Sequence, residues 1–232
     1  MKSKDFGFLA AMMLFFGAFF VFAPLGVFYH SFNASHGVVM AFIKFALLAT
    51  LGESIGLRIR TGNYNAPGFG IIPRAIVWGF LGVGIKIAFI IFATGTPLFL
   101  KYMGLAVSPA TINQPGFSLL KLLTAFSISV ALNTIFAPIF MTIHKVTDSH
   151  ITEKKGTLKG FFTPIDFGRH LRDLNWDVQW GFVFKKTIPL FWIPAHTFTF
   201  MLPPQHRILF AAFLGIVLGV ILSIAALKGK KS

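Results

Sequence analysis

Residues 207–227 read RILFAAFLGIVLGVILSIAAL, which places 20 apolar or small residues behind a single arginine. A transmembrane helix needs roughly 20 such residues, so this stretch predicts a helix that crosses a bilayer. One face of that helix carries a small residue at every fourth position: Ala211, Gly215, Gly219 and Ser223. Small residues let helix backbones approach closely, so the stripe predicts packing against another helix of the same chain or, alternatively, a dimer interface.

The chain contains six apolar stretches of this kind: residues 6–29, 37–57, 71–94, 117–145, 180–201 and 207–227. It is 55% hydrophobic and only 12% charged, whereas a soluble domain carries about 25% charged residues. Because so much apolar surface exceeds what a soluble core hides, we predict an all-α, polytopic integral membrane helix bundle of about six transmembrane helices. Residues 1–232 would then form a single transmembrane domain.

Lysine and arginine are sorted between alternate connections. Twelve of the 21 lie at the N-terminus, in the second and fourth gaps (residues 58–70 and 146–179) and at the C-terminus. Four more lie near the stretch ends that border these gaps, which makes sixteen: Arg74, Lys145, Lys185 and Lys186. Only Lys101 and Arg207 are assigned to the other gaps. Basic loops stay on the cytoplasmic side of a membrane, so both termini are expected to be cytoplasmic. The pattern predicts a multi-pass protein of the cell (cytoplasmic) membrane.

The net charge of +14 lies in connections next to apolar stretches rather than on a polar face. This placement argues against nucleic acid as a partner and favours the lipid bilayer and its anionic headgroups, at about 1 kcal/mol per basic residue near the surface. The sequence has no cysteine, which excludes disulfides, zinc–thiolate sites and thiol catalysis.

Residues 146–179 form the one sizeable polar segment, which we expect to be a cytoplasmic loop. Within it, residues 165–176 predict a short interfacial helix with Asp166 near its start. The segment also supplies an alternative function, because its basic residues would suit a scaffold that binds a partner protein.

Glu53 is the only acidic residue within the six stretches. It lies near one end of its helix, where Arg58 and Arg60 follow closely, so an ion pair with one of them is the simpler interpretation. The functional alternative is a gate or a proton-linked carboxylate that faces a pore. Lys86 is not expected to pair with Glu53, because the two would differ in depth by about 16 Å along the membrane normal.

A second group of charged or aromatic residues is expected in the outer half of the predicted membrane spans, away from the cytoplasmic side: Lys44, Lys86, Lys121, Trp192 and His196. Such a ring of Lys and His would attract anions, and we predict that it contacts solute together with Glu53. The alternative is that each lysine extends to the headgroups.

Enzyme signatures are missing from the sequence, as are metal-ligand spacings, and we expect neither catalysis nor a cofactor. The leading hypothesis is therefore a channel or transporter for small, anionic solutes. An intramembrane enzyme acting on lipid is a third, weaker hypothesis.

The C-terminal half contains Phe136-Ala137-Pro138 before a polar loop, and Pro203 and Arg207 at a Pro-x-x-x-Arg spacing. In these motifs the chain resembles a distant, bacterial-type relative of the Mpv-seventeen and peroxisomal-membrane-protein family. The resemblance covers about residues 45–225, although the His-x-Trp-Tyr motif of the family is absent. The resemblance implies a small multi-pass protein. In a eukaryote, such a protein would lie in the mitochondrial inner membrane or the peroxisomal membrane. Some members of this family are proposed to be weakly selective channels for small solutes, and a homo-oligomer is compatible with this class.

Overall fold

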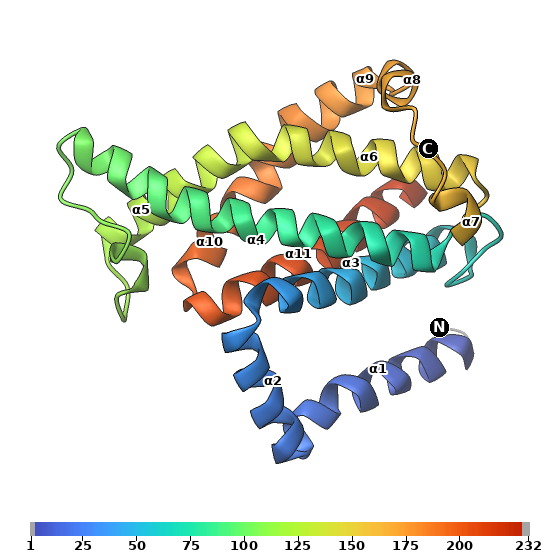
Figure 1. The fold of residues 1–232 in the computed structure, drawn as a ribbon, viewed down its shortest axis with the longest axis horizontal. Helices are drawn as coiled ribbons and strands as arrows, with labels where there is room; N and C mark the ends of the chain where they lie inside the picture. The colour runs from blue at the N-terminus through green and yellow to red at the C-terminus, as the bar shows by residue number, and fades with distance from the viewer. Residues whose placement is uncertain (1–2, 229–232) are drawn as a thin grey trace. The chain divides into compact units, whose positions relative to one another are not determined.

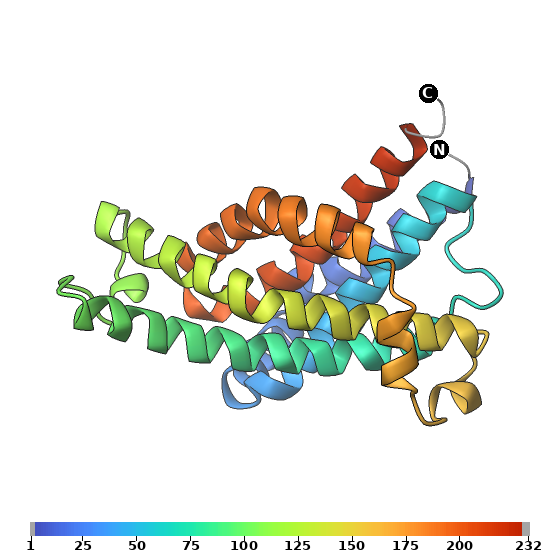
Figure 2. The same cartoon turned by 90° about the horizontal axis from the view of Figure 1, so that it is seen from above.

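The computed structural model describes residues 3–228, and every regular element in that range is helical. The chain divides at Met40 into two compact units, Met1–Met40 and Ala41–Ser232, each with its own internal contacts. Figures 1 and 2 show the helices in two views at right angles. The candidate site lies entirely in the second unit.

The first unit contains α1 (Ser3–Val21) and α2 (Ala23–Ser35), which meet at a bend of 76°. The sequence predicted one continuous helix over residues 6–29, and the structure breaks it at Phe22, whose backbone is extended. The cause is Pro24 in the first turn of α2, because a proline inside a continuous helix has no N–H to donate and its ring clashes with the carbonyl four residues earlier, whereas it is tolerated in the first turn of a new helix. Taken together, the pair is apolar enough for one broken span or a re-entrant loop.

The second unit is built on long helices. They are α3 (Gly37–Thr61), α4 (Ile71–Tyr102), the run Leu119–Glu153 and α11 (Pro204–Lys228). Among the described residues these four are long and apolar enough to cross a membrane, or five spans if the bent pair counts as one. They are compatible with a membrane protein. The number of six crossings and the side of the termini stay predictions.

Two segments have widened, π-type turns, in which an N–H bonds to the carbonyl five residues earlier. The run Leu119–Glu153 consists of α5 (Leu119–Ala131), the wide segment η2 (Leu132–Phe136) and α6 (Ala137–Glu153). The predicted stretch 180–201 forms the wide segment η3 (Gln179–Trp192) and α10 (Ile193–Met201), which are not among the span candidates. Prolines 138, 189 and 194 each lack an N–H donor, which accounts for irregular bonding in both places.

Glycines bring α3 and α11 into close contact. A Cβ added at Gly52 would lie 2.9 Å from the Cα of Ile216, and one at Gly56 would lie 2.9 Å from Ser223 Oγ. A Cβ added at Gly219 would meet the carbonyl oxygen of Gly52 at 3.4 Å. Two members of the small-residue stripe therefore lie against a helix of the same chain.

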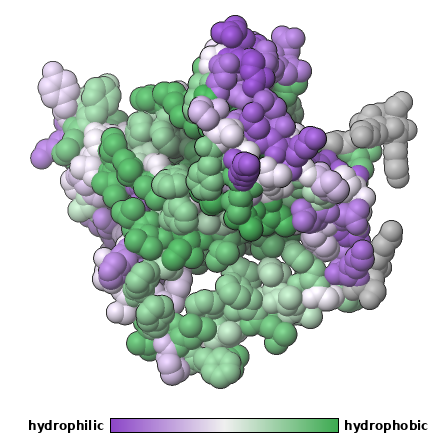
Figure 3. Space-filling view, turned by 45° about the vertical axis from the view of Figure 1, so that its right-hand side comes forward, coloured by the Kyte–Doolittle hydropathy of each residue, from purple (hydrophilic) through white to green (hydrophobic). Residues whose placement is uncertain are grey.

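The outward faces of the long helices are apolar. Phe80 on α4 is 68% exposed, Ile135 on η2 is 61% exposed, and Phe213 on α11 is 51% exposed. Figure 3 shows apolar side chains spread over much of the visible face, with hydrophilic ones gathered in patches. Contiguous apolar surface on this scale is typical of contact with lipid.

The polar segment is partly helical. α6 continues to Glu153, so the connection begins later than residue 146, and it then contains α7 (Leu158–Phe161), α8 (Phe167–Arg172) and α9 (Trp176–Val178). α8 lies within the range expected for the interfacial helix, and the Asp166 side chain accepts a hydrogen bond from the backbone N–H of Arg169. Arg169 also donates to Glu153 at 2.5 Å, which raises the pKa of its guanidinium.

Candidate functional site

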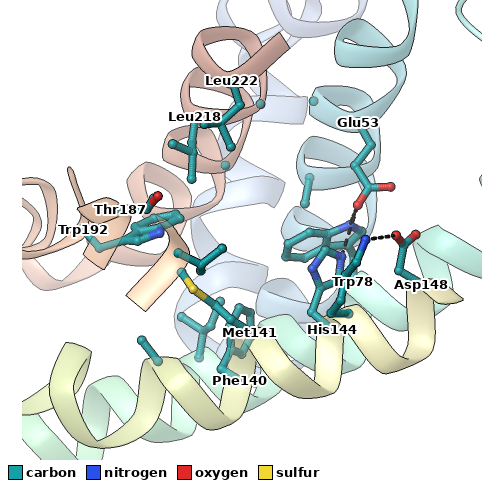
Figure 4. Close-up of a pocket in the computed structure, with 18 of the residues that line it drawn as sticks. Glu53, Trp78, Phe140, Met141, His144, Asp148, Thr187, Trp192, Leu218 and Leu222 are labelled. Carbon is teal, nitrogen blue, oxygen red and sulfur yellow. Dashed lines mark hydrogen bonds and ion pairs between the residues drawn. The ribbon is translucent and has the colours of Figure 1, made fainter. Parts of the chain in front are cut away.

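A cavity of about 490 Å³ lies between the long helices of the second unit (Figure 4). We call it the main cavity. Its walls come from α3, α4, η2, α6, η3, α10 and α11, and both π-type segments border it. Most of the lining is apolar, with side chains that include Phe45, Ile85, Phe140, Met141, Leu218 and Leu222.

A polar cluster closes one side of the main cavity. We define it as Glu53 of α3, Arg74 and Trp78 of α4, and His144 and Asp148 of α6. Arg74 Nη1 donates to Glu53 Oε2 at 2.6 Å, and Trp78 Nε1 donates to Glu53 Oε1 at 2.9 Å. His144 Nε2 lies 3.2 Å from the same Oε1 atom, and Arg74 also pairs with Asp148. The cluster thus ties three long helices together.

The charges of the polar cluster are balanced by contacts within the protein. The side chains of Arg74, Glu53 and Asp148 are only 10%, 20% and 21% exposed. Arg74 Nε additionally donates to the carbonyl of Phe69 at 2.7 Å, so the guanidinium meets acceptors on two sides. Buried charges are tolerated when they are paired and hydrogen-bonded, and these are.

The sequence interpretation named the wrong partners for Glu53. Within the described residues it pairs with neither Arg58 nor Arg60; Arg58 instead donates to the carbonyl of Gly62, and Arg60 lines the main cavity. Helical spacing was an available signal for the true partners, because Arg74 and Trp78 are four residues apart on one helix. His144 and Asp148 have the same spacing on another.

The opposite side of the main cavity is built from η2, η3 and α10. Asn133 is buried, its Nδ2 donates to the carbonyl of Ser129 at 2.8 Å, and it lies 3.1 Å from His196 Nδ1. The rings of Trp192 and His196 are 5.1 Å apart and tilted by 30°. Figure 4 shows Trp192 across the cavity from Glu53 and Trp78.

Two buried N–H donors that line the main cavity are left without partners. Within the described residues, neither Trp192 Nε1 nor Gln179 Nε2 has a hydrogen-bond acceptor. Gln179 is only 6% exposed. Unsatisfied buried donors are rare in proteins, so the cavity wall offers hydrogen bonds to whatever enters it.

The predicted solute-contacting residues do not meet in one place. Glu53, Trp192 and His196 line the main cavity, whereas Lys86 lines a second cavity. Lys44 and Lys121 border neither of these two cavities. The expected ring of basic residues is therefore not assembled around a single space.

Lys121 has a structural role. Its Nζ donates to the carbonyl of Gln114 at 2.7 Å and to that of Gly116 at 3.2 Å. These bonds hold the connection between α4 and α5, which also contains the short helix η1 (Thr111–Asn113). The lysine is 7% exposed, so it does not extend freely into the headgroups.

The small-residue stripe and the family-motif residues lie near the main cavity or beside it. All four stripe residues line it: Ala211, Gly215, Gly219 and Ser223. Of the motif residues, Phe136 and Ala137 line it, while Pro138 lies in the first turn of α6 and Pro203 directly precedes α11. Arg207 instead borders the second cavity.

Within the described range, no group of three His, Cys, Asp or Glu side chains is arranged to hold a metal ion. No family model, curated protein or solved structure matches this chain. The resemblance to the Mpv-seventeen family consequently stays a prediction from a few short motifs.

Proposed function

We propose that this protein is an integral membrane protein that passes small solutes across the bilayer through its main cavity. The observation that carries the proposal is a cavity with polar groups on two sides, enclosed by helices with apolar outer faces. Its volume of about 490 Å³ falls in the range of roughly 300–1,000 Å³ that is usual for small-molecule sites.

The lining favours a small solute with an apolar part and an anionic part. Three basic side chains, Arg60, Arg74 and Lys145, line the main cavity against two acidic ones, Glu53 and Asp148. The two unpartnered N–H donors, Gln179 Nε2 and Trp192 Nε1, would donate to a carboxylate or to another acceptor. The remaining wall is largely hydrophobic and would contact the apolar part.

Gly215 provides a direct test, because it borders the main cavity and a Cβ added there would meet no heavy atom within 4 Å. Gly215→Phe should therefore fill the cavity without displacing the backbone. Gly84 on α4 has equally open space but borders neither cavity, so Gly84→Phe is the matched control.

The measurement is efflux of isotope-labelled lactate from liposomes that contain the purified full-length protein. We expect efflux above that of empty liposomes, a strong reduction with Gly215→Phe, and no change with Gly84→Phe. Efflux equal to that of empty liposomes, or equal inhibition by both substitutions, would contradict the proposal. In that case the scaffold hypothesis becomes the better one, and its test is loss of a co-purifying protein when residues 154–160 are deleted.

A further inference from the structure

A second cavity, of about 240 Å³, lies beside α4. Lys86 and Thr94 of α4, Asn113 of η1 and Arg207 of α11 provide its polar lining. Phe89, which is 5% exposed, is the one residue common to the linings of the two cavities. The second cavity is therefore a distinct space.

Arg207 borders the second cavity, and three hydrogen bonds fix its position. Its Nε donates to the carbonyl of Leu202 at 2.9 Å, and its Nη2 donates to the carbonyl of Ile112 at 3.0 Å and to Asn113 Oδ1 at 2.9 Å. These bonds orient a guanidinium whose residue is 8% exposed. Nη1 has no partner within the described residues, so its N–H groups remain available.

The other polar groups of the lining are also unpaired. In the part of the chain that the structure describes, Lys86 Nζ, Thr94 Oγ1 and Asn113 Nδ2 form no hydrogen bond or ion pair. A helical threonine often bonds to a carbonyl one turn earlier, as Thr124 does with Leu120 at 2.7 Å. With Arg207 Nη1 included, four side chains in the described range each present a donor without an acceptor at this space, and two of them, Thr94 and Asn113, are exposed.

The charge of this lining is entirely positive. Lys86 and Arg207 are the charged residues that border the second cavity, and neither forms an ion pair within the described residues. Lys86 also lies close enough to Lys44 for electrostatic repulsion between them. An anion would relieve this repulsion and accept the free N–H and O–H groups. Phosphate suits the set well, because its several oxygens match an arginine fork and a lysine ammonium.

The position of the second cavity brings it to the membrane surface. Pro109 and Asn113, from the connection between α4 and α5, border it, as does Pro204 at the start of α11. Irregular backbone that faces lipid does not occur within the hydrocarbon layer. The cavity thus extends from Lys86, near the middle of α4, toward the end of that helix, where lipid headgroups would lie, and Ile90 beside it is 55% exposed.

We infer that the second cavity binds a phosphate group, carried either by a lipid headgroup or by free phosphate. A volume of about 240 Å³ exceeds the roughly 30 Å³ occupied by one water molecule severalfold, which leaves room for such a group. The inference does not depend on solute transport through the main cavity.

Three probes test it on the full-length protein in an uncharged detergent that contains no phosphate. They are short-chain phosphatidylglycerol, the matching diacylglycerol without phosphate, and inorganic phosphate. The readout is the midpoint of thermal unfolding against probe concentration, with bound lipid counted by native mass spectrometry. Lys86→Gln removes one cation and Thr94→Leu fills the cavity, while Lys101→Gln, on the same helix but outside the cavity, is the control.

We expect phosphatidylglycerol to raise the midpoint saturably, and diacylglycerol to have no such effect. Lys86→Gln should weaken binding about tenfold, as for loss of one hydrogen bond to a charged group, and Lys101→Gln should not. Saturable binding of inorganic phosphate alone, with the same response to the substitutions, would support the site and assign it to the free ion. Equal effects of phosphatidylglycerol and diacylglycerol, or unchanged binding in both cavity variants, would overturn the inference.

Discussion

The polar cluster and the second cavity both contain basic side chains, but within the described residues only those of the polar cluster are paired with acidic ones. In the polar cluster, Glu53 and Asp148 balance Arg74, and all three helices that contribute are joined by those contacts. In the second cavity, Lys86 and Arg207 both border a space without an acid in its lining. Burial of a charged side chain therefore does not by itself indicate a binding site. The useful indication is a buried or enclosed polar group whose partner is missing.

Glu53→Ala tests the balanced side of this comparison and should have the largest effect. Removing one partner of a buried ion pair leaves the other uncompensated and costs about 3–5 kcal/mol. We expect a loss of this size in the free energy of unfolding, measured by SDS titration in mixed micelles. Glu153→Ala is the control, because that carboxylate is 37% exposed and its pair with Arg169 lies at the surface, where water weakens it, so its loss should be much smaller. Equal losses in the two variants would show that the polar cluster does not stabilise the bundle.

Arg207→Leu should have an intermediate effect, because Arg207 belongs to both kinds of environment. Its Nε and Nη2 bonds satisfy carbonyls of Leu202 and Ile112, and the latter residue is 2% exposed. A buried acceptor left unpaired costs about 1–3 kcal/mol, so we expect a loss of about 2 kcal/mol in the same titration. Arg172→Leu, at an exposed position of α8, should change the stability little. No loss with Arg207→Leu would mean that those carbonyls find other donors.

Lys86→Gln should have the smallest effect on stability when phosphate and anionic lipid are absent. The ammonium has no partner within the described residues, so its removal breaks no contact. We expect the free energy of unfolding to change by no more than about 0.5 kcal/mol. A loss comparable with that of Glu53→Ala would contradict the comparison, since it would reveal a stabilising partner for Lys86.

Local patterns predicted some features of the chain well. The stretches 37–57, 71–94 and 207–227 are helical throughout, and the stretch 117–145 is helical from Leu119 onward. Each is a long apolar run, and the wider connections between them contain Gly, Pro and polar residues. Asp166 before α8 is a second example, because a capping side chain acts on the backbone only three residues away. The break at Pro24 was visible in the same local terms, but the length of the apolar run concealed it.

The partners of Glu53 required information that no single helix holds. Arg74 and Trp78 share one face of α4, and His144 and Asp148 share one face of α6, but spacing along a helix does not say which faces meet. An estimate of depth along each helix separated Glu53 from Lys86. It could not decide whether Arg60 or Arg74 is the arginine that pairs with Glu53. Rotation and offset between helices decide such contacts, and they depend on packing of the whole unit.

Taken alone, the sequence determined that this protein is made of apolar helices, where most of them lie, and that small residues recur along α11. These properties follow from interactions between residues a few positions apart and from the transfer of side chains out of water. Only the tertiary structure decided that Glu53 is neutralised by Arg74, that the small residues of α11 border a cavity, and that Lys86 and Arg207 share another. The physical reason is that a cavity and a missing partner are properties of several helices together, set by how their surfaces fit.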